Sequence, residues 1–215
     1  MSGMGLGETV AAALAPMGRV RRLGRGEFLF LQGDRPGHVY VVLEGWLKVT
    51  RLGSEGSESV LHLVGPGEFV GIGTVLADEP LPASACALMG AKVLAVPTDK
   101  FRRFLLERPV VALDVIRIMA SRLHELQQRF HNLSTRRAET RLASLLLSLV
   151  GGAGDGPMEV ALSRAELAGL CGTRLYTVSR VLNGWQRAGI VWLGRRRVRV
   201  LRPDLLAELA DGCQP

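Results

Sequence analysis

Cysteine is scarce in this chain: its 215 residues include three, Cys86, Cys171 and Cys213, and none belongs to a Cys-x-x-Cys pair. Disulfide frameworks, zinc sites and iron–sulfur clusters need several ligands at close spacing. The chain offers too few ligands for any of these, and we expect no cofactor. Three widely spaced cysteines are typical of buried or incidental thiols in a reducing compartment.

Long apolar runs are also absent, although hydrophobic residues make up 47% of the chain. The longest apolar stretches, such as Leu142 to Val150, fall far short of the roughly 20 residues that span a bilayer. The segment from Met1 to Leu14 lacks the basic start and apolar core of a signal peptide. We therefore expect a cytoplasmic protein with no membrane contact and, at this length, two domains with a substantial core.

Lysine is nearly absent too, since Lys48, Lys92 and Lys100 are the only lysines beside many arginines. The formal net charge of +7 is unevenly distributed. Residues 136–202 hold 12 basic and 4 acidic residues, a net +8, whereas residues 1–135 hold 15 and 13, a net +2. A coding bias toward arginine would explain the residue type but not its position. The charge therefore favours a polyanion-binding region in the C-terminal third.

Glycine, in contrast, recurs from Arg19 to about Pro97, where it separates short runs of β-prone residues. Many short strands with glycine at their turns are typical of an antiparallel barrel, sandwich or jelly roll. The expected strands are Glu27–Leu31, Val39–Leu43, Trp46–Arg51, Val60–Val64 and Val93–Val96. The N-terminal half is therefore predicted to be a β-rich domain.

A segment without glycine or proline follows Pro109 and extends to about Leu133, which predicts one long helix. Its apolar residues are spaced by alternating steps of four and three, as in the heptad seam between two paired helices. They are Ala112, Ile116, Met119, Leu123, Leu126, Phe130 and Leu133. The pattern predicts dimerisation through this helix. The stripe could instead pack on the chain's own β-rich domain, and both arrangements can hold for different faces.

A second helix is expected over residues 136–150, before a glycine-rich loop over 151–157. Ser163 and Glu166 then form a capping box, in which each side chain bonds the other residue's amide, so a short helix begins at Ser163. It extends to Leu170, and Cys171-Gly172-Thr173 makes a tight turn. A further helix is expected over about 174–186. Helix, glycine-containing turn and helix at this spacing predict a helix-turn-helix.

At 100° per residue this further helix has two distinct faces. Its apolar face contains Leu175, Val178, Val181, Leu182 and Trp185. The opposite face, which we expect to point outward, contains Thr173, Tyr176, Thr177, Arg180 and Arg187. A surface helix of any protein could show the same pattern, so the residues that follow decide the interpretation.

A hairpin over residues 190–200, which we call the wing, follows with a turn at Gly194-Arg195. Its alternation puts Arg197 and Arg199 on one face and Val198 and Val200 on the other. Arginines beside a recognition helix are suited to bind phosphates while the helix enters the major groove. The predicted contacts to double-stranded DNA are Thr173, Arg174, Tyr176, Thr177, Arg180, Arg197 and Arg199.

With these motifs in this order, the chain resembles the CRP/FNR superfamily, the cyclic-AMP receptor protein and its relatives, over about residues 19–202. The matching segments are Gly37–Val49, Gly65–Gly71 and Leu167–Leu182. The resemblance implies an α+β fold: a double-stranded β-roll (a jelly roll) over 1–108, a dimerisation helix over 109–135 and a winged helix-turn-helix over 136–215. It further implies a homodimer on an inverted-repeat operator, with RNA polymerase as a partner if the protein is an activator.

The resemblance also assigns roles to two residues of the recognition helix. Arg180 occupies the position of the arginine that reads guanine, and an arginine fork on guanine is the commonest specific base contact. The family usually has a glutamate one turn earlier that accepts from cytosine, and Tyr176 stands there instead. We therefore expect an operator that differs from the family's common half-site.

The effector pocket implied by the resemblance departs from cyclic-AMP-binding members. Gly71 is followed by Ile72 where those members have a ribose-binding glutamate, and the segment around Ser84 has no phosphate-binding arginine. Leu126 and Gln127 replace the Thr-Ser pair that meets the adenine. Loss of the charge-assisted pairing would cost on the order of 1.5–3 kcal/mol. We therefore expect cyclic AMP not to be the ligand, and the effector to be unidentified or unnecessary.

Two alternatives stay open at this point. A haem- or other small-molecule-sensing regulator of the same family could use some of the four histidines, which are His38, His62, His124 and His131. A cupin-like metal enzyme could share a glycine-rich β-roll, but cupins need closely spaced histidines with a nearby glutamate, and His38 and His62 have no such partners. The predicted function is therefore DNA-binding regulation, not catalysis.

Overall fold

The computed structural model describes residues 6–53, 58–151 and 159–211, and of residues 58, 129–135 and 151 it describes the backbone alone. Its contacts divide the chain into two compact units, Met1–Leu126 and Gln127–Pro215. The division falls within the long helix. The division expected from the sequence, at 108 and 135, stays a prediction.

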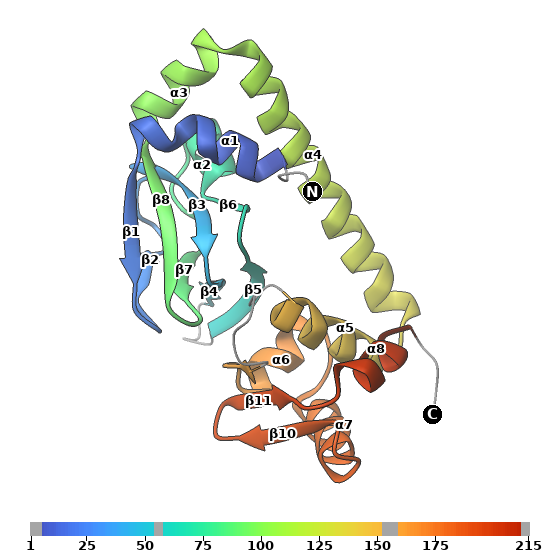
Figure 1. The fold of residues 1–215 in the computed structure, drawn as a ribbon. Helices are drawn as coiled ribbons and strands as arrows, with labels where there is room; N and C mark the ends of the chain where they lie inside the picture. The colour runs from blue at the N-terminus through green and yellow to red at the C-terminus, as the bar shows by residue number, and fades with distance from the viewer. Residues whose placement is uncertain (1–5, 54–57, 152–158, 212–215) are drawn as a thin grey trace. The chain divides into compact units, whose positions relative to one another are not determined.

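The first unit contains two four-stranded antiparallel sheets (Figure 1). One sheet has the strand order β1-β8-β3-β6 and the other β2-β7-β4-β5. The strands are β1 (Arg19–Leu23), β2 (Phe28–Phe30), β3 (His38–Glu44), β4 (Leu47–Leu52), β5 (Glu58–Val64), β6 (Phe69–Val70), β7 (Ser84–Ala87) and β8 (Ala91–Pro97). The five strands expected from the sequence are thus confirmed within one or two residues at each end.

Strand β3 shows how the alternation of its side chains builds two layers of core. Tyr40 and Val42 belong to the apolar cluster that fills the space lined by strands of both sheets. Val39 and Val41 point to the other face, where they pack with helical residues such as Phe101. Because successive side chains of a strand alternate between faces, one strand serves both layers.

Three helices that the sequence analysis did not predict cover this second face. They are α1 (Leu6–Leu14), α2 (Ile72–Ala77) and α3 (Thr98–Glu107), and a short 3-10 turn, η1 (Ala15–Met17), follows α1. Val10, Leu14, Val75 and Phe101 are their most deeply buried residues, and all four belong to the same cluster. The helices therefore close the side of the sheet that would otherwise expose apolar residues.

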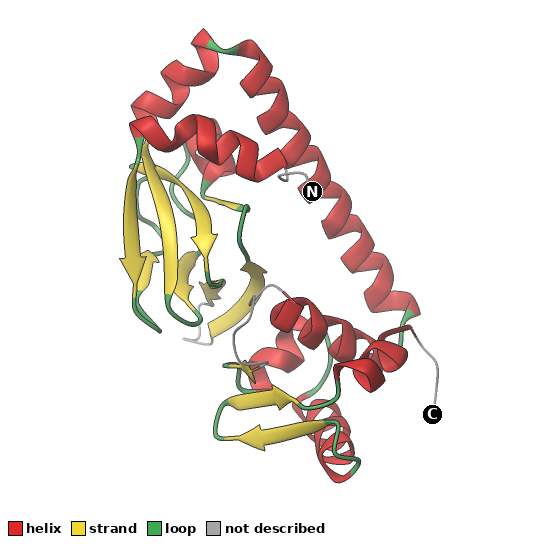
Figure 2. Cartoon of the chain, viewed as in Figure 1, coloured by secondary structure: helices red, strands yellow, loops and turns green. Residues whose placement is uncertain are grey.

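The long helix is α4 (Pro109–Thr135), as the segment without glycine or proline predicted (Figure 2). Val115 is buried against the β-rich domain, together with the partly buried Ile118 and Met119. Of the other heptad residues, Ala112 is half-buried, whereas Ile116 is 61%, Leu123 59% and Leu126 50% exposed in the single chain. One face of α4 thus packs on the β-rich domain, and the other is exposed in the single chain. The side chains of Phe130 and Leu133 lie outside the described residues.

The second unit begins with the rest of α4 and contains the helix-turn-helix. Its further elements are α5 (Ala138–Gly151), β9 (Glu159–Val160), α6 (Arg164–Leu170), α7 (Leu175–Arg187), β10 (Val191–Gly194), β11 (Arg197–Val200) and α8 (Pro203–Asp211). The strands form one antiparallel sheet in the order β10-β11-β9. The predicted loop over 151–157 lies almost wholly outside the described residues. Strand β9 and helix α8 were not predicted.

Candidate nucleic-acid interface

Helix α6 begins where the capping box predicted. The Ser163 hydroxyl accepts from the Glu166 amide at 3.2 Å, and the Glu166 carboxylate accepts from the Ser163 amide at 2.8 Å. These bonds satisfy amide donors that a helix start leaves unpaired. The direction of α6 is therefore fixed at its first turn.

The turn of the helix-turn-helix is held from α5. Arg141 donates from Nε to the Cys171 carbonyl at 2.8 Å and from Nη2 to the Gly172 carbonyl at 3.3 Å. Thr173 donates its amide to the Ala168 carbonyl at 2.9 Å. Backbone groups at the end of α6 thus find partners within the same domain, which keeps α6 and α7 at a defined angle. Arg141 was not singled out in the sequence analysis, because no motif spacing marks it.

The Cys171 side chain is buried at this turn. Burial raises the pKa of the Cys171 thiol to about 12, and the positive charge of Arg141 opposes that rise only in part. At neutral pH the group is a protonated thiol. A thiol in this state is a packing group, not a nucleophile or metal ligand.

Helix α7 buries one face and exposes the other, as its amphipathic pattern predicted. Val178, Val181, Leu182 and Trp185 are buried. The Trp185 indole donates to a Glu139 carboxylate oxygen at 3.0 Å, which ties α7 to α5. The helix is therefore anchored from behind, with its opposite face available.

The exposed face of α7 presents Tyr176, Arg180, Asn183 and Arg187. Their spacing of four, three and four residues puts them in one stripe along the helix. Asn183 was missed in the sequence analysis, although the same angular argument would have found it. One prediction was wrong: Leu175, assigned to the buried face, is 52% exposed, because the first residue of α7 lies beyond the packed neighbours. Of the other predicted contacts, Arg174 is exposed, while Thr173 and Thr177 are half-buried.

The strand arginines of the wing show the predicted alternation. Arg197 and Arg199 are exposed, whereas Val198 and Val200 are buried. Both arginines form ion pairs with the Glu159 carboxylate, at 3.3 Å from Arg197 Nη1 and 3.0 Å from Arg199 Nη2. No local pattern indicates these pairs, because Glu159 and Arg199 are 40 residues apart in the chain.

The turn of the wing is tied to the helix-turn-helix. Arg196 has a positive φ of 55° and its guanidinium lies 3.3 Å from the Glu166 carboxylate that also caps α6. Arg164, the first residue of α6, donates to the Asn183 side chain at 3.2 Å. Helices α6 and α7 and the wing therefore form one connected basic surface.

The residues expected to form an effector pocket lie in several elements of the β-rich domain and on α4. Gly71 precedes α2 with a φ of 78°, and Ile72 is buried in the cluster beneath the helices. The Ser84 hydroxyl accepts from the Gln32 amide at 2.9 Å. Leu126 and Gln127 are exposed on α4. Their joint role in a pocket stays a prediction.

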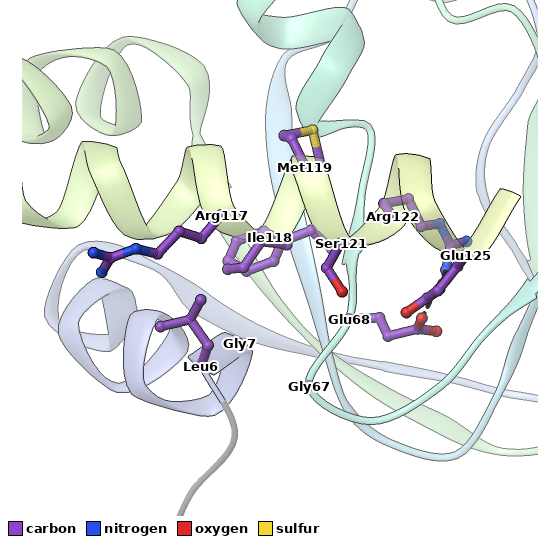
Figure 3. Close-up of a pocket in the computed structure, with 11 residues that line it drawn as sticks. Leu6, Gly7, Gly67, Glu68, Arg117, Ile118, Met119, Ser121, Arg122 and Glu125 are labelled. Atoms are coloured by element: carbon purple, nitrogen blue, oxygen red, sulfur yellow. Dashed lines mark hydrogen bonds and ion pairs between the residues drawn. The ribbon is translucent and has the colours of Figure 1, made fainter. Parts of the chain in front are cut away.

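A cavity of about 220 Å³ lies elsewhere in this domain, between α1, the 65–69 turn and α4 (Figure 3). Arg122 Nη1 lies 2.7 Å from a Glu68 carboxylate oxygen, and the other Glu68 oxygen accepts from the Gly65 amide at 2.6 Å. Glu125 lies 3.5 Å from the same arginine nitrogen. None of the residues expected to bind the effector lines this cavity.

Within the described residues, no cluster of three or more histidine, cysteine, aspartate or glutamate side chains could hold a metal ion. The helices of this part of the chain include none that is long and apolar enough to cross a membrane.

Comparison with known proteins agrees with this geometry. Residues 20–108 match the family model of the cyclic nucleotide-binding domain, and residues 140–209 match that of the Crp-like helix-turn-helix domain. The cyclic AMP receptor protein of Thermus thermophilus is 35% identical, over 95% of this chain and 94% of its own length. The transcriptional activator protein Anr of Pseudomonas protegens is 32% identical, over 90% of this chain and 81% of its own length.

Solved structures show the same relationship. The catabolite activator protein of Thermus thermophilus is 32% identical with a TM-score of 0.51, and the match covers 98% of this chain and 97% of that one. A CRP-family transcriptional regulator from the same organism is 26% identical with a TM-score of 0.71, covering 89% of this chain and 96% of that one. This chain belongs to the CRP/FNR family of transcription regulators, in which a β-rich cyclic nucleotide-binding domain accompanies a helix-turn-helix DNA-binding domain.

Proposed function

We propose that this protein is a cytoplasmic homodimer that binds an inverted-repeat operator with α7 of each protomer in the major groove, and that it acts by binding and not by catalysis. The stripe of Tyr176, Arg180, Asn183 and Arg187 on the exposed face of α7 carries this proposal. A helix whose back is packed and whose front holds donors and cations fits the recognition helix of a helix-turn-helix. If the protein is an activator, RNA polymerase is its expected partner.

Arg180 is the proposed base-reading residue. It is exposed, and none of the described residues forms a hydrogen bond or ion pair with its guanidinium. An unengaged fork can donate to both O6 and N7 of guanine. Tyr176, one turn earlier, offers a hydroxyl and an aromatic ring in place of a carboxylate. The proposed operator therefore keeps a guanine and differs at the neighbouring pair.

The proposed dimer forms through the outer face of α4. Ile116, Leu123 and Leu126 are exposed large apolar residues in a heptad register, and Phe130 and Leu133 continue that register in the sequence. A partner helix would remove this surface from water at about 25 cal/mol per Å² of apolar area. The regulators of this family act as dimers, which supports the same arrangement here.

The proposed regulator does not depend on cyclic AMP, although several relatives are named for that ligand. Ile72 is buried among apolar side chains, and Leu81, Ala83 and Ala85 are buried where a phosphate-binding arginine would be needed. An anionic ligand needs a charge-assisted donor in such surroundings.

Selection of binding sites from a random pool of duplex DNA by the purified full-length protein tests the proposal. We expect enrichment of an inverted repeat with a guanine in each half-site. Recovery of unchanged, random sequence would contradict sequence-specific binding, and enrichment of a single unrepeated site would contradict the two-fold arrangement.

A further inference from the structure

The wing has four arginines, and carboxylates from outside the hairpin lie beside three of them. Glu159 of β9 pairs with Arg197 and Arg199, and Glu166 of α6 pairs with Arg196. A basic wing binds DNA through its cations. A carboxylate between two of those cations opposes that role and therefore needs a physical explanation.

The position of Glu159 is set by the sheet. Strand β9 pairs antiparallel with β11, and Glu159 lies directly opposite Arg199 in the ladder. One carboxylate oxygen lies 3.3 Å from Arg197 Nη1 and the other 3.0 Å from Arg199 Nη2. The Glu159 side chain is 16% exposed, whereas those of Arg197 and Arg199 are 51% and 52% exposed. The anion is thus the shielded member of the cluster, and the two cations face solvent.

We propose that Glu159 limits the affinity of the wing for the DNA backbone by neutralising one of the two positive charges of Arg197 and Arg199. Carboxylate and phosphate oxygens accept from the same guanidinium donors, so Glu159 competes with DNA phosphates. The inference rests on the proposed DNA binding by this domain. It adds a residue that sets the strength and the salt dependence of that binding.

The ring of Trp192 makes it possible to distinguish two roles of Glu159, neutralising charge and holding Arg199 in position. The Arg199 guanidinium carbon lies 5.4 Å from the centre of the Trp192 ring, and the two residues face each other in the β10–β11 ladder. Stacking on the ring holds Arg199 in place even without the carboxylate. Removal of Glu159 therefore releases charge and leaves Arg199 on the same surface.

Arg195, at the turn of the wing, provides a comparison with Arg197, because no carboxylate of the described residues pairs with it. It is exposed, and the described residues provide it with no ion-pair or hydrogen-bond partner. Its charge is already available to a phosphate. We therefore expect Arg195→Gln to weaken binding more than Arg197→Gln in the unsubstituted background, and the two losses to become similar once Glu159 is replaced by Gln.

The test uses full-length protein, a short random-sequence duplex and salt from about 50 to 200 mM. Glu159→Gln is expected to bind about 3- to 10-fold tighter at the low-salt end, with a salt slope steeper by up to about 1, because one more phosphate is neutralised. Glu159→Asp keeps the charge and is expected to bind like the unsubstituted protein. Glu107→Gln, an exposed change of the same charge on α3, is the matched control.

Binding by Glu159→Gln that is no tighter than that of Glu107→Gln would overturn the proposal. Weaker binding would overturn it as well and would show that Glu159 presents the arginines to DNA. In both cases the DNA-binding function would stand, because the unsubstituted protein would still bind. Absence of binding by the unsubstituted protein would overturn the DNA-binding function itself.

Discussion

Arg180 and Arg197 belong to one basic surface but differ in their surroundings. Arg180 is exposed on a helix whose other face is packed, and no described residue pairs with it. Arg197 lies on a strand beside the Glu159 carboxylate. A base contact requires an unengaged fork, whereas a phosphate contact depends on local charge. The two arginines are therefore expected to respond differently to substitution.

Arg180→Ala is expected to lose roughly 1–3 kcal/mol of binding to the selected operator and to keep most of its binding to random DNA. The reason is that the proposed contact of Arg180 is to the edge of a base and not to the DNA backbone. Fluorescence titration with both duplexes measures the two losses. Arg103→Ala, an exposed arginine of α3, is the control for net charge. Equal losses on operator and random DNA would remove Arg180 from the base-reading role.

Cys171 is expected to resist alkylation in the folded protein. Its thiol is buried and its pKa is raised to about 12, so the reactive thiolate is a very small fraction at pH 7 to 8. Because the pKa lies above this range, labelling should grow as the pH rises toward it. Mass spectrometry of the peptide that contains Cys171, after iodoacetamide treatment of native and urea-unfolded protein, measures the difference. Rapid labelling of the native protein at pH 7 would show an accessible thiolate instead.

Among the elements, the sequence was most informative where a short pattern determines local geometry. The capping box located the start of α6, because it consists of bonds between residues three positions apart. The five strands followed from runs of β-prone residues separated by glycine, and the long helix followed from a segment without glycine or proline. The helices α1, α2 and α3 were not predicted, because their amphipathic patterns are short. Helix α2 begins at Ile72, directly after Gly71, which adopts a positive φ of 78°.

The candidate site, too, was predictable only where its geometry is determined within one element. The exposed stripe of α7 and the alternation of the wing depend on angles within one element, so the exposed positions of Arg180, Arg197 and Arg199 were predictable. Arg141 and Glu159 act across elements that are distant in the sequence. A single sequence contains no signal for such pairs, because they depend on tertiary packing.

Leu123→Arg is expected to disrupt the proposed pairing of α4. The residue is exposed in the single chain, so the substitution is tolerated within the domain but places like charges face to face in a dimer seam. The mutant should sediment as a monomer and lose operator affinity with every proposed base-contacting residue intact. Leu106→Arg, an exposed leucine on α3, is the matched control and should stay dimeric. A dimeric Leu123→Arg protein would show that α4 does not form the seam.

At the scale of the whole molecule, the β-rich domain matches the cyclic nucleotide-binding domain, and Ile72 stands where we propose that a ribose-binding group is missing. Calorimetric titration with cyclic AMP is therefore expected to show no binding tighter than about 0.1 mM, or roughly −5.5 kcal/mol. Micromolar binding that also tightened operator affinity would contradict the independence from cyclic AMP. Micromolar binding without that effect would show a nucleotide site that does not control DNA binding.

The proposed two-fold symmetry of the protein requires two-fold symmetry of its DNA site. Related by one axis, the two α7 helices are expected to enter successive major grooves about 34 Å apart, so half-sites lie roughly 10 base pairs apart. The most direct measurement compares the affinity of full-length protein for the selected repeat with that for the same repeat lengthened by about half a helical turn between its half-sites. We expect the lengthened site to bind as weakly as a single half-site. Equal affinity for both duplexes would contradict the two-fold arrangement of the α7 helices.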